Sequence, residues 1–154
     1  MAQEIRGSGT REIHARLLLD SYRRLTGKEL LRVPDGADPA AVIEEADIIV
    51  LSHDTEQDPV LNYGNRAARA LWEMDMETFV RTPSRLTAEP MEREERARFL
   101  AQVAERGYVD DYTGIRISST GKRFYIVNAT VWNLVDDYGA NRGQAATFSA
   151  FTYI

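Results

Sequence analysis

The stretch FYIVNATVWNLV, from Phe124 to Val135, is predicted to form a β-strand that is apolar on both of its faces. Successive side chains of a strand point to opposite sides of the sheet. On this alternation the first face carries Phe124, Ile126, Thr130, Trp132 and Leu134. The second face carries Tyr125, Val127, Ala129, Val131 and Val135. A strand of this kind lies inside a sheet that is covered on both sides, so we expect a helical layer on each face.

Two amides interrupt the apolar pattern, Asn128 on the first face and Asn133 on the second. A buried amide without a partner costs roughly 1 to 3 kcal/mol, so each must be hydrogen-bonded to protein, water or a ligand. For Asn128 two interpretations stay open. Either it projects into a cavity and binds a ligand, or it satisfies a neighbouring backbone group.

The composition is that of a single globular domain. The chain has 154 residues, of which 44% are hydrophobic and 28% are charged. Its net charge of -5 and the absence of a stripe of Lys and Arg argue against a nucleic-acid partner. No stretch has the length and apolarity of a membrane span or a signal peptide. We therefore expect a cytoplasmic protein with no membrane contact.

The chain contains no cysteine. Disulfides, thiolate metal ligands, cysteine nucleophiles and thioether-linked chromophores are thereby excluded.

The N-terminal third of the chain is predicted to form a helical cap over residues 10–46, after a disordered tail of residues 1–9. Between Thr10 and the stop at Gly27, apolar residues recur at spacings of three and four, which predicts an amphipathic helix. Its apolar face is formed by Ile13, Leu17, Leu18 and Leu25. Asp38 is a typical N-cap for a second, short helix. The apolar face of the first helix either packs on its own sheet or pairs with a second copy of the chain, or does both.

Residues 47–154 are predicted to form the main domain. Two short strands, 48–52 and 60–63, precede a helix capped by Asn65 and further short helical segments. A longer helix is predicted next, over residues 91–106. Three long strands follow, over residues 108–118, 124–135 and 144–153. Strands joined by hairpins form an antiparallel sheet, so the predicted fold class is α+β.

This order of elements is that of a PAS domain, and the sequence resembles the MEKHLA domain, a PAS-like family. That family occurs as a stand-alone bacterial protein and at the C-terminus of class III homeodomain leucine-zipper transcription factors of plants. The matching stretches are SHDTEQDPVLNYGNRAARALWE (52–73), PSRLTAEP (83–90), REERARFLAQVAERGYVDDYTGIRISSTGKRF (93–124) and ATVWNLVDDYGANRGQAATF (129–148). The resemblance implies a five-stranded antiparallel sheet, with short helices enclosing a cavity on one face and the N-terminal helix on the other.

PAS-like domains hold haem, flavin, a covalent chromophore, a small metabolite or nothing. A covalent chromophore is excluded because the chain has no cysteine. Haem is not expected, because neither His14 nor His53 lies on the predicted cavity-side helices. The cofactor is therefore left unknown, and a small molecule bound without a covalent bond is the remaining expectation.

Several polar and aromatic residues are candidates for the cavity wall: His53, Asn62, Trp72, Arg85, Arg116, Tyr125 and Asn128. Trp72 or Tyr125 would give a stacking wall. Arg85 and Arg116 stand among uncharged neighbours, where each would either clamp a carboxylate or phosphate or pair with an acidic residue. The acidic residues considered for that pairing are Glu89, Asp110 and Asp111. Asn62 is either a ligand contact or part of a turn.

The segment from His53 to Asp58 has the residue types of a metal site or an acid–base pair, but also those of a solvated loop. We expect the loop, and no metal or catalytic site. The sequence thus predicts a sensory or interaction module that takes part in signalling, binds a small molecule and acts as a homodimer. The alternatives are a ligand-free dimerisation or protein-interaction domain and, less favoured, an enzyme that uses His53.

Overall fold

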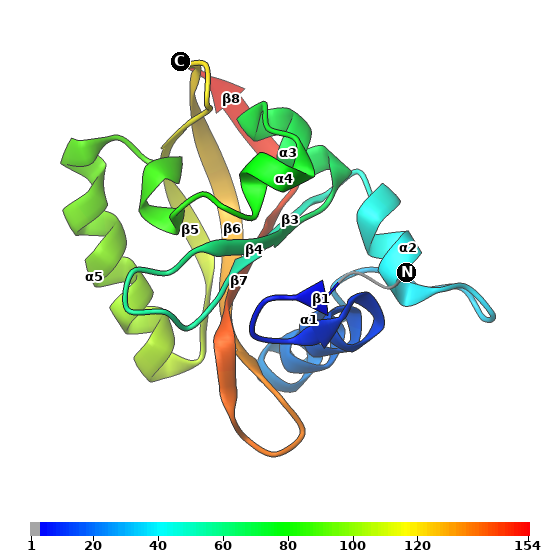
Figure 1. Ribbon diagram of the computed structural model, residues 1–154. Coiled ribbons are helices and arrows are strands. Elements are labelled where there is room, and N and C mark those ends of the chain that lie inside the picture. The colour runs from blue at the N-terminus through cyan, green and yellow to red at the C-terminus, as the bar shows by residue number, and fades with distance from the viewer. Residues whose placement is uncertain (1–3) are drawn as a thin grey trace.

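The computed structural model describes residues 4–154, without the side chains of residues 90–92, and shows a sheet placed between two helical layers (Figure 1). The main sheet has six antiparallel strands in the order β4-β3-β7-β6-β5, and β8 also pairs with β6. The strands are β3 (Ile49–His53), β4 (Leu61–Gly64), β5 (Tyr108–Ile117), β6 (Arg123–Val135), β7 (Asn141–Phe148) and β8 (Ala150–Tyr153). The predicted α+β class with an antiparallel sheet is confirmed. One strand more than the expected five is present, because the last predicted strand is broken at Ser149.

One helical layer is formed by α1 (Arg11–Thr26) and α2 (Pro39–Glu45). The hydroxyl oxygen of Thr10 accepts a hydrogen bond from the amide of Ile13 and so caps α1, which ends at Gly27 with a φ of 75°. Asp38 caps α2 in the same way. Both predicted helices are confirmed. Ile13 differs from the expected apolar face, because its side chain is 54% exposed.

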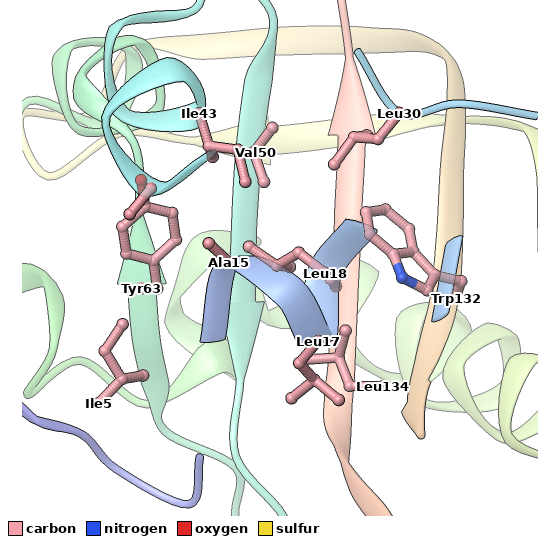
Figure 2. Close-up of a cluster of buried hydrophobic side chains, with 12 residues drawn as sticks. Ile5, Ala15, Leu17, Leu18, Leu30, Ile43, Val50, Tyr63, Trp132 and Leu134 are labelled. Atoms are coloured by element: carbon pink, nitrogen blue, oxygen red, sulfur yellow. The ribbon is translucent and has the colours of Figure 1, made fainter. Parts of the chain in front are cut away.

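The N-terminal layer packs on the sheet through one hydrophobic cluster (Figure 2). Leu17 and Leu18 of α1 lie against Trp132 and Leu134 of β6 in this cluster. Ile5 belongs to the same cluster and is buried. It is part of a hairpin of β1 (Glu4–Ile5) and β2 (Gly9–Thr10). Residues 4–9 are therefore not the predicted disordered tail, because burial of Ile5 fixes them, and residues 1–3 lie outside the described chain.

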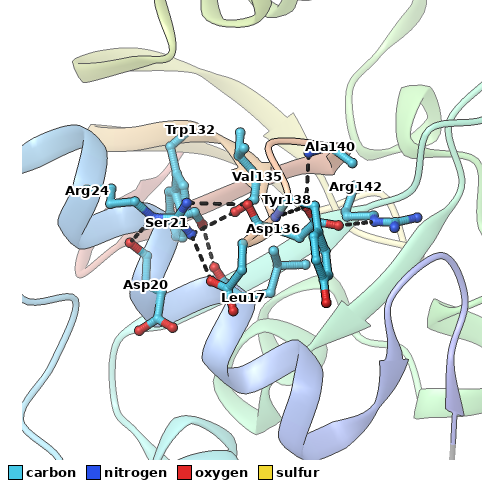
Figure 3. A network of polar contacts seen from close by, with 11 residues as sticks. Leu17, Asp20, Ser21, Arg24, Trp132, Val135, Asp136, Tyr138, Ala140 and Arg142 are labelled. Atoms are coloured by element: carbon cyan, nitrogen blue, oxygen red, sulfur yellow. Dashed lines mark hydrogen bonds and ion pairs between the residues drawn. The ribbon is translucent and has the colours of Figure 1, made fainter.

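Polar contacts also fasten α1 to the sheet (Figure 3). The indole nitrogen of Trp132 donates a hydrogen bond of 3.1 Å to Ser21 Oγ. Arg24 donates to the carbonyl oxygens of Val135 and Asp136, at 3.0 and 3.3 Å. The carboxylate of Asp136 in turn orders the loop that follows β6 by accepting from the amides of Tyr138 and Ala140.

The second helical layer contains α3 (Arg66–Trp72), α4 (Met76–Phe79), the 3-10 helix η1 (Ser84–Thr87) and α5 (Pro90–Arg106). Asn65 caps α3 as predicted, since its side chain accepts from the amide of Ala68. The longest helix, α5, ends at Arg106 as predicted, and Gly107 is its C-cap. Figure 1 shows α5 on the side of the sheet away from α1. The predicted layer of short helices on one face is confirmed.

The alternation of side chains along β6 changes at Asn128, which corrects the predicted division of its faces. Asn128 has a φ of 51°, and the pairing of β6 with β5 shifts by one residue at this point. Such a bulge reverses which side chains point to which face. Apolar residues of β6 packed toward α3 and α5 are Phe124, Ile126, Ala129 and Val131. Trp132 and Leu134 point to α1 instead of sharing a face with Phe124.

No helix within residues 4–154 is long and apolar enough to cross a membrane. The cytoplasmic location, and the boundary between a cap of residues 10–46 and a domain of residues 47–154, stay predictions.

Candidate functional site

A cavity of about 60 Å³ lies between the sheet and the layer of α3, η1 and α5. Much of its wall is apolar, with side chains that include Leu51, Leu61, Phe99, Ile126, Val131 and Phe148. Polar residues that reach this wall include His53, Ser84, Arg96, Tyr112, Arg116 and Gln144. The combination of a mainly apolar wall with a few polar groups is typical of ligand sites. His53, Trp72 and Arg116 are the three predicted candidates that line this cavity.

Arg116 is positioned by its place in β5, where it stands opposite Phe124 and so faces the second helical layer. It is only 7% exposed. Its guanidinium donates to the carbonyl oxygen of Ile115 at 2.8 Å and to the hydroxyl of Tyr112 at 3.3 Å. It forms no ion pair with any described carboxylate, so the predicted pairing with an acidic residue is wrong for Arg116. A buried charge without a counter-charge is costly.

A second guanidinium, that of Arg96 in α5, reaches the same cavity. It donates a hydrogen bond to the hydroxyl of Ser84 in η1. Burial, together with the neighbouring charge of Arg116, lowers the pKa of Arg96 to about 10. Arg96 is therefore still protonated near neutral pH, and two guanidinium groups share one poorly solvated space.

His53 ends β3 at the cavity wall. Its Nδ1 lies 2.9 Å from the carbonyl oxygen of Asp54, which can only accept, so Nδ1 carries the proton. In the neutral ring, Nε2 is then an acceptor, and it is buried without a hydrogen-bond partner among the described residues. The neighbouring Gln144 amide instead donates to Leu100 O and Asn133 Oδ1. Burial lowers the pKa of His53, which favours this neutral form.

Trp72, at the end of α3, is 2% exposed and packs edge-on against Phe124 and Phe148. Its ring centroid lies 5.3 Å from that of Phe124 and 6.2 Å from that of Phe148. Its indole nitrogen is a donor that is buried without a partner among the described residues. The cavity wall therefore holds three donor groups and one acceptor whose hydrogen-bonding capacity the protein does not fill.

Asn62 does not belong to this cavity, contrary to the prediction. It lies in a chain of hydrogen bonds toward α1, in which Ser52 Oγ donates to Asn62 Oδ1 at 2.6 Å and Asn62 Nδ2 donates to Arg6 O at 2.8 Å. His14 completes the chain, with Nε2 at 3.0 Å from Ser52 Oγ and Nδ1 at 2.7 Å from Ser8 Oγ. Burial lowers the pKa of His14 to about 4. Every polar atom of the Asn62 and His14 side chains is thus paired within the protein.

Three further candidates lie on the surface, which corrects their prediction. Arg85 pairs with Asp58 at 3.2 Å, and its side chain is 47% exposed. Arg85 thus pairs with a carboxylate, as the ion-pair interpretation predicted, but its partner is not Glu89, Asp110 or Asp111. Tyr125 is 42% exposed, because it points away from Phe124 and the cavity layer. Asn128 is exposed because it occupies the bulge. Its backbone N–H donates to Thr113 Oγ1 at 3.4 Å.

The loop after β3 is organised by Asp54, which is 3% exposed. One carboxylate oxygen accepts from the amides of Glu56 and Val60, at 3.2 and 3.0 Å, and the other faces Arg6 at 3.4 Å. The carboxylate of Asp54 thus shapes the loop and is not hydrogen-bonded to the His53 ring. No three metal-ligating side chains come together within the described part of the chain.

The sequence reasoning missed Arg96, Ser84, Tyr112 and Gln144 as cavity residues. A signal for Arg96 was present, because it stands three, four and seven residues before Phe99, Leu100 and Val103. These positions share one face of a helix, so a charge interrupts the apolar stripe of α5. The other three residues carry no comparable signal.

Solved structures that resemble this chain are PAS and light-oxygen-voltage domains. The PAS domain of a protein from Colwellia psychrerythraea aligns with a TM-score of 0.61 and 14% identity, over 75% of this chain and 92% of that one. A light-oxygen-voltage domain studied with a flavin analogue aligns at 0.57 and 14% identity, over 75% and 83%. An RNA-binding light-oxygen-voltage receptor aligns at 0.56 and 16%, over 77% of this chain and 35% of the receptor. At these identities the likeness shows the fold.

A comparison with protein families matches the model described as "MEKHLA domain" to residues 12–153. The matched range begins in α1 and ends in β8. No curated protein matches the chain.

Proposed function

The chain belongs to the MEKHLA domain family, and from this we propose that it is a PAS-like sensory domain that binds a small molecule without a covalent bond. The site is the cavity between the sheet and the layer of α3, η1 and α5. The observation that supports this proposal is that two residues of the cavity wall, His53 and Trp72, each hold a buried polar atom without a partner in the described chain.

The free-energy cost of unpaired buried groups explains why this observation supports a ligand. Leaving a buried donor or acceptor unpaired costs about 1 to 3 kcal/mol. A protein keeps few such groups, and each one needs an explanation. A ligand that pairs with them recovers this free energy only in the bound state, which is the differential stabilisation that a sensory domain requires.

The fold of the light-oxygen-voltage domains raises the question of a flavin, and the cavity does not fit one. Pockets for ligands of drug size have volumes of roughly 300 to 1,000 Å³. The cavity here, of about 60 Å³, is several times smaller, because Trp72, Phe99 and Tyr112 fill the space beside the sheet. We therefore derive no flavin chemistry for this chain.

Native mass spectrometry of the purified protein, followed by a thermal-shift screen of small metabolites, tests the proposal. A ligand at 100 times its dissociation constant should stabilise the protein by about 2.7 kcal/mol. The variant Trp72→Phe, which removes one unpaired donor from the wall, should reduce this shift. A screen in which no compound shifts the melting temperature would contradict ligand binding.

A second candidate function is a homodimerisation or protein-interaction domain without a ligand. It is supported by a group of exposed apolar residues at the C-terminal edge of the sheet. The group consists of Phe151 and Tyr153, which are 39% and 54% exposed and whose ring centroids lie 5.9 Å apart. Light scattering on the chain and on the double variant Phe151→Ser, Tyr153→Ser would test it. A monomer in both would contradict dimerisation at this edge.

We further propose that the domain is not an enzyme. His53 is the only histidine at the cavity, its Nδ1 is hydrogen-bonded to a backbone carbonyl rather than to a carboxylate, and burial lowers its pKa. A turnover that is found in the wild type and lost in His53→Ala would contradict this.

A further inference from the structure

We propose that the cavity binds a short monocarboxylate, with its carboxylate held by Arg96 and Arg116. This inference rests on the proposed function, since it names the class of ligand for the same cavity. It is carried by the two positive charges of the site, by the small cavity volume and by the apolar remainder of the wall.

The charge balance of the cavity calls for an anion. Burial and, next to it, the charge of neighbouring Arg116 both disfavour the charged form of Arg96. Neither forms an ion pair with a described carboxylate. Asp58, the acidic residue that acts on Arg96 from a distance, is paired with Arg85 at the surface. An anion between the two guanidinium groups supplies the missing negative charge.

The hydrogen-bonding capacity of the two arginines is also incomplete. A guanidinium has five N–H donors. Arg116 uses two of its nitrogens, toward Ile115 O and Tyr112 Oη, and Arg96 uses one, toward Ser84 Oγ. Donors therefore remain on both side chains, and an acceptor-rich group fits them best.

The volume of the cavity limits the size of the ligand. One water-sized probe occupies roughly 10 to 15 Å³ of cavity volume. The cavity of about 60 Å³ thus holds a molecule of roughly four to six non-hydrogen atoms. Acetate, propionate and butyrate fall in this range, whereas a nucleotide, a haem or a fatty acid of long chain does not.

The apolar wall favours a carboxylate over an inorganic anion of similar size. Leu61, Ile126 and Phe148 line the cavity together with the polar groups. These side chains suit an alkyl tail, while phosphate and sulfate would place polar oxygens against them. A carboxylate also matches the planar fork of a guanidinium through two parallel hydrogen bonds.

Isothermal titration at constant ionic strength tests the inference with propionate, inorganic phosphate, sulfate and neutral propionamide as probes. We expect saturable binding of propionate at a Kd at least tenfold lower than that of the other three. Arg116→Met and Arg96→Met should each weaken propionate binding about tenfold or more, the loss expected for a hydrogen-bonded charge. Arg85→Gln removes an exposed arginine outside the cavity, and its Kd should stay within about twofold of the wild type.

The outcomes separate this inference from the proposed function. If propionamide binds as tightly as propionate, or the arginine variants retain full affinity, the carboxylate assignment fails while ligand binding in the cavity stands. Tighter binding of phosphate or sulfate also overturns the carboxylate assignment. If no probe binds and no metabolite shifts the melting temperature, both proposals fail.

The melting temperature of the variants without ligand shows whether the arginines have a purely structural role. Relief of an unpaired buried charge should leave Arg116→Met at least as stable as the wild type without ligand. A fall in melting temperature with unchanged affinity would overturn the inference. Should Arg116→Met fail to fold, Arg116→Lys keeps the charge and loses the planar fork, so its propionate affinity should still fall severalfold.

Discussion

The two faces of the sheet carry similar buried residues, but the hydrogen bonds of these residues are complete on one face only. Each face has one buried tryptophan and one histidine. On the α1 face, Trp132 donates to Ser21 and both ring nitrogens of His14 are paired with serine hydroxyls. On the cavity face, Trp72 Nε1 and His53 Nε2 have no partner in the described chain. The α1 face is complete without a ligand, whereas the cavity face is not.

This difference separates the residues that hold the fold together from those available for binding. The α1 face joins the N-terminal hairpin, α1 and the sheet through side chains that all find partners within the chain. The cavity face also contains the two arginines that lack a described counter-charge. We therefore expect substitutions on the α1 face to change stability and matched substitutions on the cavity face to change binding.

The largest expected effect comes from removal of the two histidines. His14→Ala leaves Ser8, Ser52 and their neighbours with unpaired groups and opens a buried space, which should lower the free energy of unfolding by about 2 to 4 kcal/mol. His53→Ala removes a ring with one hydrogen bond beside an existing cavity, so the loss should be about 1 kcal/mol. Urea denaturation of both variants measures the difference, and equal losses would refute the contrast between the faces.

A somewhat smaller effect concerns pH. The pKa of folded His14, about 4, lies below its unfolded value of 6.5, so the unfolded chain binds more protons between these values. Stability is complete above pH 6.5 and is lost as the pH falls toward 4, by about 2 kcal/mol between pH 7 and pH 5. Urea denaturation at both pH values checks this.

The variant His14→Gln, which keeps a donor and an acceptor at the site, should lose most of this pH dependence. His53→Gln should keep the larger part of it, although the pKa of His53 is also lowered by burial and acts in the same direction. An unchanged slope in His14→Gln would assign the acid sensitivity to other groups.

The smallest effect is expected from the tryptophans. Trp132→Phe and Trp72→Phe remove the same volume, but only the first breaks a hydrogen bond. Trp132→Phe should therefore be more destabilising by about 1 kcal/mol in urea denaturation. A greater loss in Trp72→Phe, measured without ligand, would mean that its indole nitrogen is satisfied in solution.

Much of the fold could be predicted from the sequence because local signals and the global arrangement agree. Asp38 and Asn65 cap helices where predicted, and α1 begins at Arg11, directly after the predicted start at Thr10. The alternation along β6 could not be followed past Asn128, because a bulge depends on how the neighbouring strand pairs rather than on residue type.

The candidate site was less predictable, since it depends on where side chains from distant segments meet. Arg116 and Arg85 both stand among uncharged neighbours in the sequence, yet one is 7% exposed and the other pairs with Asp58 at the surface. Strand register decides the first case and loop geometry the second. Arg96 was the one missed residue with a local signal, namely a charge on an apolar helical stripe.

The bulge at Asn128 sets the phase in which the side chains of β6 alternate between the two faces of the sheet. It sets which residues after it face α1, so that Trp132 meets Ser21 and Val131 meets the cavity layer. Deletion of Asn128 would remove the bulge and leave a regular strand with both sets in place, whereas one further inserted residue would exchange them. Deletion of Asn128 should therefore leave a folded chain, whereas insertion of one alanine after Asn128 should abolish folding even though every original residue is still present.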